Sequence, residues 1–298
     1  MIIMQLADLH THSTFSDGLA SPSELVTFAR KMGLIAVALT DHDTIDGLGE
    51  FSKAASAAGV EAIGGIEISA YFHDQPVHIL GYGIDPSHPD LHRELSHMQQ
   101  IRTERNEKIR KRFAALGIPI YEEELSSGSR GQIGRPHFAR LLVAKGIVSS
   151  EEEAFARFLR KNGAAYVAKE KYPAAHAISC IRQTGGVAVL AHPWCTNSSL
   201  TTLPALISRL MDIGLDGIEA FYPSHPQAVQ QRLVELAKKL RILITGGSDY
   251  HGGERALFQA NRESHSYLLP THLLAGLRQA MASRRQQTES ANPAAIGP

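Results

Sequence analysis

The chain has 298 residues, 43% of them hydrophobic and 20% charged, which is a globular composition and argues against a largely disordered or fibrous protein. This length suits one large domain or a barrel that carries an insertion. The Lys and Arg residues balance the Asp and Glu residues, 30 against 30, and the net charge of zero excludes a global attraction to nucleic acid or to membranes. An anionic substrate would therefore have to be bound by local charge.

The sequence offers no pattern that points to a membrane or to secretion. The N-terminus, MIIMQLADLH, lacks a basic region followed by a long apolar run, and nowhere do 18 apolar residues follow one another. Cys180 and Cys195 could form at most one disulfide and do not form a CxxC motif. We expect a cytoplasmic protein in a reducing environment, with no membrane partner. The oligomeric state is not predicted.

Seven short apolar runs rich in β-branched residues predict seven strands, at residues 2–9, 34–39, 60–68, 77–82, 187–190, 215–221 and 242–245. Helical patterns lie between most of them. The first covers residues 22–32, with Ser21 as the N-cap, Pro22 at the first helical position and Gly33 as the stop, and others cover 204–212, 227–240 and 271–283. Strands alternating with helices predict parallel pairing, and hence an α/β fold built as a doubly wound sheet or a barrel.

The alternation fails once, where helical patterns dominate residues 88–171. We interpret this stretch as an inserted helical subdomain between two parts of a barrel, residues 1–87 and 172–285. Its first helix, at 91–116, carries IRTERNEKIRKRF, a charge-rich stretch typical of a solvated helix face, and only the adjoining Phe113 could stack on a base. Residues 286–298 lack periodicity and are expected to be disordered.

Histidines and acids follow the ends of the first two predicted strands. His10 and His12 are two residues apart in an extended segment, so they share one face and could bind one cation, with Asp8 before them and Asp17 after them. A lone histidine would more often be a packed or surface residue. The second strand repeats the pattern, because it ends in TDHDT with His42 at its centre.

The remaining strands also contain or precede a metal-ligating residue type. Glu67 lies in an apolar run, where a buried carboxylate needs a salt bridge or a metal ion, and His78 alone would be read as a core histidine. His192 and Glu219 belong to the next two strands, and SDYHG, with Asp249 and His251, follows the last.

In a parallel barrel every strand delivers its carboxyl end to the same rim, so we expect these side chains to converge. Six histidines with Asp17, Glu67 and Asp249 exceed the ligand needs of one ion, which predicts two or three divalent metals. Nitrogen and carboxylate ligands without a thiolate suit Mn²⁺, Zn²⁺, Fe²⁺ or Co²⁺ better than Mg²⁺ or Ca²⁺.

At this point the sequence resembles the PHP (polymerase and histidinol phosphatase) family. The shared motifs are DLHTHS at 8–13, TDHDT at 40–44, GIE ending at Glu67, AHP around His192 and SDYHG at 248–252. The resemblance implies a distorted seven-stranded (β/α) barrel with up to three metals.

The resemblance also implies a ligand set. A first metal would be bound by His10, His12, Glu67 and Asp249, a second by Glu67, His78 and His192, and a third by Asp17, His42 and His251. Glu67 would bridge the first two. Asp8, Asp41, Asp43 and Glu219 would orient imidazoles rather than bind a metal.

Within the family, the GRPH sequence at 134–137 and the FYPSH sequence at 221–225 resemble the branch of nucleoside 3′,5′-bisphosphate phosphatases, related to ribonuclease AM. This branch implies a phosphomonoesterase, with manganese as the expected metal and zinc or iron as options, that converts the bisphosphate to a nucleoside 5′-monophosphate. Some members also trim short RNA from its 5′ end. Arg135, His137 and His225 would bind substrate, and Arg135 could grip a phosphate bidentately or be a surface arginine that caps a helix.

The expected mechanism is hydrolysis by a water made acidic by two metals, with Glu67, Asp249 and His251 as catalytic residues. His225 could protonate the leaving group or bind a phosphate. Other functions remain open: hydrolysis of histidinol phosphate or another small phosphomonoester, a non-catalytic metal-binding module, or an amidohydrolase. The last is disfavoured because no predicted strand ends in a lysine that could be carboxylated.

Overall fold

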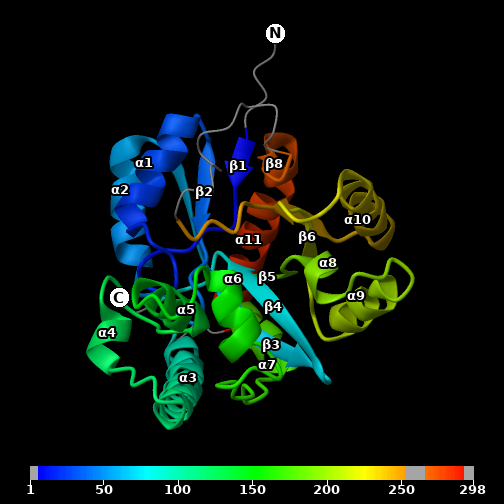
Figure 1. Ribbon diagram of the computed structural model, residues 1–298. Helices are drawn as coiled ribbons and strands as arrows, with labels where there is room; N and C mark the ends of the chain where they lie inside the picture. The colour runs from blue at the N-terminus through cyan, green and yellow to red at the C-terminus, as the bar shows by residue number, and fades with distance from the viewer. Residues whose placement is uncertain (1–5, 253–265, 292–298) are drawn as a thin grey trace.

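The computed structural model describes residues 6–252 and 266–291, and these form an α/β fold around one sheet of eight strands (Figure 1). The sheet curls into a nearly closed barrel with the strand order β7-β6-β5-β4-β3-β2-β1-β8. The strands are β1 (Leu6–Asp8), β2 (Ala36–Leu39), β3 (Glu61–Phe72), β4 (Gln75–Tyr82), β5 (Val187–Leu190), β6 (Gly217–Phe221), β7 (Leu243–Gly246) and β8 (Leu269–Pro270). Each of the seven predicted runs overlaps one of β1 to β7. β3, β4 and β7 extend beyond their runs, and residues 2–5 of the first run lie outside the described ranges. β8 adds an eighth strand that the sequence did not predict.

The pairing is parallel except at β4 and β8. β1, β2 and β3 pair in parallel, as do β5, β6 and β7, but β4 runs antiparallel to both β3 and β5, and β8 antiparallel to β1. The prediction of parallel pairing throughout is therefore wrong at β4. Only His73 and Asp74 separate β3 from β4, and a two-residue loop returns the chain antiparallel, whereas a parallel crossover needs about a dozen residues or more.

The chain after β7 closes the barrel against the chain after β1. The Leu9 amide donates to the Gly246 carbonyl at 3.1 Å, and the His12 amide donates to the Tyr250 carbonyl at 2.9 Å. A Cβ at Gly247 would lie 2.4 Å from the Cβ of His10, so only glycine allows this approach. The closure brings the SDYHG motif against the DLHTHS motif.

Helices cover the outside of the barrel (Figure 1). α1 (Pro22–Met32) begins and ends as predicted, with a capping box between Ser21 and Glu24 and a left-handed Gly33 at its end. The others outside the segment between β4 and β5 are α2 (Leu48–Ala58), which was not predicted, α8 (Pro193–Thr196), α9 (Leu203–Asp212), α10 (Gln227–Leu240) and α11 (Thr271–Ala291). α11 corrects the expected disorder of 286–298, because residues 286–291 are helical, and 292–298 lie outside the described residues.

Helical elements occupy the chain between β4 and β5. They are α3 (Pro89–Ala115), α4 (Glu122–Ser126), α5 (Arg135–Ala144), α6 (Glu151–Ala154), the π-helical turn η1 (Phe155–Leu159) and α7 (Ala174–Gln183). α7 packs into the barrel core, whereas the others contribute to a core of their own. Phe113, Phe138 and Phe158 are central to a hydrophobic cluster separate from the barrel core, and the ring of Phe113 lies 6.1 Å and 5.5 Å from the other two. α3 to α6 gather on one side of the barrel (Figure 1).

Two further hydrophobic clusters belong to the barrel. The larger joins strand residues such as Ile66, Ile79 and Val189 to residues of α7, α9, α10 and α11, and the smaller packs α1 and α2 against β2. Among the described helices, none combines the length and the apolar character that a membrane crossing requires.

Candidate metal centre

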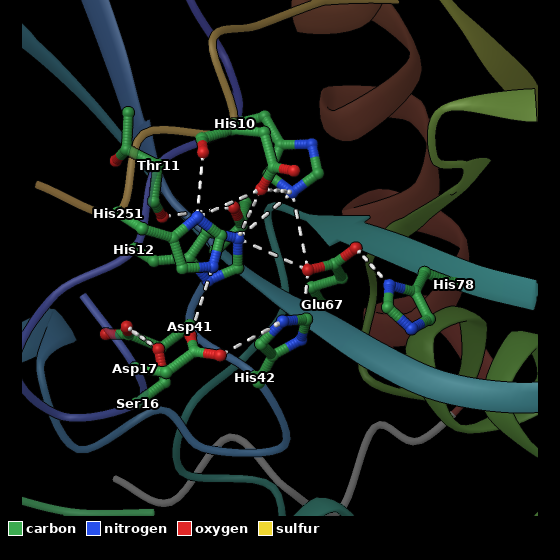
Figure 2. Close-up of polar contacts among 12 residues, drawn as sticks. His10, Thr11, His12, Ser16, Asp17, Asp41, His42, Glu67, His78 and His251 are labelled. Atoms are coloured by element: carbon green, nitrogen blue, oxygen red, sulfur yellow. Dashed lines mark hydrogen bonds and ion pairs between the residues drawn. The ribbon is translucent and has the colours of Figure 1, made fainter. Parts of the chain in front are cut away.

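Imidazoles and carboxylates meet at one rim of the barrel (Figure 2). They lie in β3 and β4 and directly after β1, β2, β5 and β7. Glu67, near the middle of β3, is the centre of this cluster and is 1% exposed. Its Oε2 lies 3.3 Å from His10 Nε2, 3.2 Å from His12 Nε2 and 3.0 Å from His42 Nδ1. Its Oε1 lies 2.8 Å from His78 Nδ1 and 3.2 Å from His192 Nε2. One buried carboxylate thus faces five imidazoles.

These atoms converge without satisfying one another. Glu67 Oε2, His42 Nδ1 and Asp17 Oδ1 are buried and have no hydrogen-bond partner of acceptable geometry, although each is close to an oppositely charged or polar atom. Ligands held about 2.1 Å from one cation at right angles lie about 3 Å apart, which is the spacing around Glu67. The donor set therefore fits divalent cations better than a network of hydrogen bonds.

Three groups of side chains place their ligand atoms within 4.8 Å of one another: His10, His12, Glu67 and Asp249; His12, Asp17, His42 and His251; and His42, Glu67 and His78. The first has the members that the resemblance implies for the first metal. The second contains the three residues expected at the third metal, with His12 added. The last differs from expectation, because His42 stands where His192 was expected, and His192 reaches the centre only through Glu67 Oε1.

The acids of the cluster are ionised, whereas its imidazoles differ in charge. Against the effect of burial, nearby carboxylates raise the pKa of His10, His42 and His192, and raise that of His251 to about 10. Burial raises the pKa of Glu67, but the imidazoles of His42, His78 and His10 hold this pKa well below its usual range. Burial likewise opposes ionisation of Asp17 and Asp249, but neighbouring imidazoles, above all His251 for Asp17 and His10 for Asp249, hold the pKa of each acid well below its usual range. All three acids are therefore ionised near neutral pH. Burial lowers the pKa of His78 to about 4 against the opposing effect of Glu67, so this imidazole is neutral, which is its metal-binding form.

Backbone strain collects at this rim. Among the described residues, Asp43, His192 and Asp249 have φ values of 53°, 29° and 52°, in the left-handed region that non-glycine residues rarely adopt. Such conformations persist where the surrounding structure fixes them, and they are common at functional sites. Here they lie at three separate strand ends around the cluster.

Glu219 is the acid that orients imidazoles, as the resemblance implies. Its Oε1 lies 3.0 Å from His10 Nδ1, which leaves His10 Nε2 to face Glu67, and its Oε2 accepts from the His192 amide at 2.8 Å. The same role is wrong for Asp8, which accepts from the Ser248 and His10 amides, and for Asp41, which accepts from Ser13 and Ser16. These two acids fix the loops rather than the rings.

Asp43 was expected to orient an imidazole, but its side chain bonds to other residues. Its carboxylate pairs with Arg102 of α3 and lies 3.8 Å from Lys169 Nζ, and it accepts from the Ser69 amide at 3.0 Å. Its carbonyl accepts from Gln99 Nε2 at 3.2 Å. Asp43 therefore ties the loop that carries His42 to the helices between β4 and β5.

A cavity of about 710 Å³ lies between the cluster of histidines and acids and these helices. Asp17, His42 and His78 line one side of it, and its basic residues are Arg102, Arg105, Arg135, Lys161, Lys169 and Lys171. The interpretation of the charged stretch of α3 as a solvated face is therefore wrong for Arg102 and Arg105. The chain, which is neutral overall, thus concentrates positive charge beside the cluster of candidate metal ligands.

The pKa shifts reflect this concentration. Burial, opposed by Asp43 and assisted by Arg102 and Arg105, lowers the pKa of Lys169 to about 8. Burial, with the charge of Arg135, lowers the pKa of Arg105 to about 10. Such mutual repulsion between partly buried cations is relieved by an anion, and the site is accordingly suited to phosphate.

Of the three predicted substrate-binding residues, Arg135 lines this cavity and the two histidines do not. Arg135 lines the cavity and uses one donor on the Leu159 carbonyl at 3.3 Å, which leaves further donors of its guanidinium. His137 is buried, and its Nδ1 accepts from the Gly134 amide at 3.1 Å. His225 is 3% exposed, with Nδ1 3.0 Å from the Ala220 carbonyl. Neither histidine lines a cavity that contacts the metal-ligating residues, so the structure does not place them against a substrate there.

A second cavity of about 670 Å³ reaches the opposite side of the cluster, where Asp249, His251 and Tyr222 line it. Pro136 and Phe155 line both cavities. Phe155 opens the π-helical turn, a distortion that is frequent at functional sites. Sequence reasoning missed Tyr222, although it lies in the FYPSH motif, and missed Arg102, Arg105 and Lys169, for which the spacing of basic residues was the only available signal.

Comparison with known proteins places these features in a family. A family model described as the PHP domain matches residues 8–172. A 5′-3′ exoribonuclease of Haemophilus influenzae is 36% identical over 82% of this chain and 89% of its own length. A 3′,5′-nucleoside bisphosphate phosphatase of Chromobacterium violaceum is 32% identical over 82% of this chain and 86% of its own length.

Another relative shows that the similarity extends to a different phosphate ester. The phosphoribosyl 1,2-cyclic phosphate 1,2-diphosphodiesterase of Eggerthella lenta is 33% identical over 83% of this chain and 94% of its own length. Among solved structures, a protein of Bifidobacterium adolescentis, whose assignment as a metal-dependent phosphoesterase is itself provisional, superposes with a TM-score of 0.83 at 30% identity, over 93% of this chain and 96% of that one.

Proposed function

The chain belongs to the PHP domain family, and on that premise we propose that it is a metal-dependent phosphoesterase that removes the 3′-phosphate from nucleoside 3′,5′-bisphosphates. The product would be a nucleoside 5′-monophosphate. The observation that carries this proposal is the 710 Å³ cavity, which has metal-ligating residues on one side and basic side chains around the rest. A substrate with two phosphates matches both.

The basic side chains would bind the phosphate that is not cleaved. Arg105 uses Nε and Nη2 on the Val167 carbonyl, so Nη1 is left for an anion, and Arg135 keeps donors beyond the one on Leu159. Lys169 Nζ lies 3.3 Å from the Ser69 carbonyl and adds a third positive charge. Together they would hold the substrate so that its other phosphate reaches the metal-ligating residues.

The cluster would hold two or three cations, with Mn²⁺ the expected ion and Zn²⁺ or Fe²⁺ the others that suit this donor set. The ligands would be His10, His12, Asp17, His42, Glu67, His78, His192, Asp249 and His251. Divalent cations bound here would make a water nucleophile available near neutral pH and offset the charge on the phosphoryl oxygens. Glu67, ionised and shared between ligand groups, would fix the spacing of the cations. Asp249 and His251 lie where they could orient the attacking water.

The proposal assigns residues 1–87 and 172–285 to the catalytic barrel and 88–171 to an inserted unit that supplies substrate contacts. The hydrophobic cluster of α3, α5 and η1, and the position of Arg102, Arg105 and Arg135 in the cavity, support this division. β1 to β7 would be the seven strands of the distorted family barrel, with β8 as an edge addition.

Trimming of short oligoribonucleotides from the 5′ end is a second candidate activity. It is favoured by the second cavity, which would offer room on the far side of Asp249 and His251 for the rest of a chain whose 5′-phosphate lies among the basic residues. Histidinol phosphate is less suitable, because it carries an amine and an imidazole and offers no second phosphate to the basic cavity.

The test is a comparison of adenosine 3′,5′-bisphosphate, adenosine 3′-monophosphate, adenosine 5′-monophosphate and histidinol phosphate with the Mn²⁺-loaded protein. We expect the bisphosphate to have the highest kcat/KM and to yield adenosine 5′-monophosphate, identified by chromatography. Equal or faster turnover of histidinol phosphate, or release of the 5′-phosphate, would overturn the proposal.

A further inference from the structure

Tyr222 is the residue of the FYPSH motif that reaches the metal-ligating cluster. It follows β6, and its hydroxyl donates to Asp249 Oδ2 at 2.7 Å. The other oxygen of the same carboxylate, Oδ1, lies 3.1 Å from His12 Nε2 and 3.3 Å from His10 Nε2. Asp249 is thus divided, with one oxygen facing the cluster and the other held by a phenol.

We propose that Tyr222 is a positioning residue that restricts Asp249 to binding a metal ion through Oδ1 alone. A carboxylate that is free to rotate can present either oxygen or both to a cation. The hydrogen bond from Tyr222 occupies Oδ2 and fixes the carboxylate plane, so that Oδ1 is directed toward the group formed by His10, His12 and Glu67. Partners of this kind orient metal ligands and tune affinity.

The surroundings of Tyr222 hold the phenol in place. Its ring packs against the ring of His192 at 5.3 Å and against that of His225 at 5.1 Å. Gln230 Nε2 donates to the His225 carbonyl at 3.1 Å, which fixes the turn after β6 to α10. The buried His225 therefore supports Tyr222 through packing of the two rings.

The ionised carboxylate of Asp249 can only accept, so the Tyr222 phenol is the donor of their hydrogen bond. The backbone of Asp249 has φ of 52°, a conformation that persists where surrounding contacts fix it. A neutral donor can restrain this carboxylate without adding charge to a site crowded with imidazoles.

The inference rests on the proposed function only in that Asp249 binds a metal, and the test is therefore a measurement of metal binding. Tyr222→Phe keeps the ring and removes the hydroxyl. The matched control is Tyr172→Phe, which removes another buried hydroxyl that donates to a carboxylate, Glu94 Oε2 at 2.7 Å, outside the groups of candidate metal ligands. Metal-free protein is titrated with Mn²⁺, and free Mn²⁺ is measured by electron paramagnetic resonance. Circular dichroism melting gives the stability of both variants.

For Tyr222→Phe we expect the Kd of one Mn²⁺ site to rise about 10- to 100-fold, as for other partners of metal ligands. The kcat of this variant should recover at saturating Mn²⁺ with KM unchanged, and Tyr172→Phe should bind Mn²⁺ as the wild type does. Unchanged Mn²⁺ affinity in Tyr222→Phe would overturn the inference. So would a loss of kcat that persists when every site is filled, because the phenol would then act on substrate. A third outcome would separate the two claims. If Tyr222→Phe bound Mn²⁺ more weakly than the wild type, but the wild type released no phosphate from the bisphosphate, the proposed function alone would be overturned.

Discussion

Replacing Arg135 by methionine tests whether the basic cavity recognises the second phosphate. Arg135 lines the cavity, and the charge of its guanidinium is crowded there, since burial lowers its pKa and Arg102 adds to that effect. Methionine retains most of the side-chain length and removes the charge and the donors. The substitution therefore isolates the interaction with an anion from the packing of the cavity wall.

The magnitude follows from the contacts that would be lost. A hydrogen bond to a charged group contributes about 1.5–3 kcal/mol, and each 1.4 kcal/mol is a factor of ten, so the substitution should lower kcat/KM for the bisphosphate about 10- to 150-fold. The loss should not be complete, because Arg105 and Lys169 remain in the cavity. Adenosine 3′-monophosphate, which lacks the second phosphate, should lose little.

The assay is steady-state phosphate release from both substrates, with Arg112→Met as the control. Arg112 lies on α3 like two of the cavity arginines but is exposed, so its replacement should leave kcat/KM unchanged. An equal loss for both substrates would refute the reasoning, because Arg135 would then act on the cleaved phosphate or on the fold. No loss for the bisphosphate would remove Arg135 from the site.

Three other substitutions test the remaining parts of the account. Burial lowers the pKa of Lys169 to about 8, so its positive charge is lost as pH rises through that value. The kcat/KM for the bisphosphate should therefore fall more steeply above pH 8 in the wild type than in Lys169→Arg. Parallel pH profiles of the two proteins would contradict this. Asp43 is buried, but Lys169 and Arg102 hold its pKa well below the usual 3.8, so its stabilising effect is present above pH 3.8 and is lost as pH falls below it. Urea denaturation of Asp43→Asn should accordingly show a loss of about 3 kcal/mol at neutral pH, because Arg102 loses its partner, with a smaller difference below pH 3.8. Glu67→Ala should lower kcat by orders of magnitude and reduce bound metal while the far-ultraviolet circular dichroism persists, and near-normal turnover in metal-loaded variant protein would refute its role as a ligand.

The strands were predictable because their apolar runs are short, rich in β-branched residues and separated by recognisable helix signals. Ser21, Pro22 and Gly33 fixed α1 to the residue, since capping is a local interaction. The direction of β4 was predicted wrongly because the prediction followed the alternation of strands and helices and ignored the length of one loop. Only His73 and Asp74 separate β4 from β3. Loop length carried the information that periodicity did not.

The cluster was predictable to the extent that strand ends share a rim, which is a general property of barrels. The basic cavity was not, because α3 has charges on several faces and nothing local shows that Arg102 and Arg105 turn toward the barrel. Their burial depends on how α3 crosses the rim. Contacts between residues distant in sequence fix that crossing, because both Arg102 and Gln99 of α3 bond to Asp43. Tyr222 was missed for the same reason, because its partner Asp249 lies 27 residues along the chain.

The central claim, that histidines and acids from distant strands bind a shared set of cations, is tested most directly by anomalous diffraction from Mn²⁺-loaded crystals. The account predicts two or three anomalous peaks within the cluster, one of them among His10, His12, Glu67 and Asp249. Peaks confined to the protein surface, with no density between these four side chains at saturating Mn²⁺, would contradict it.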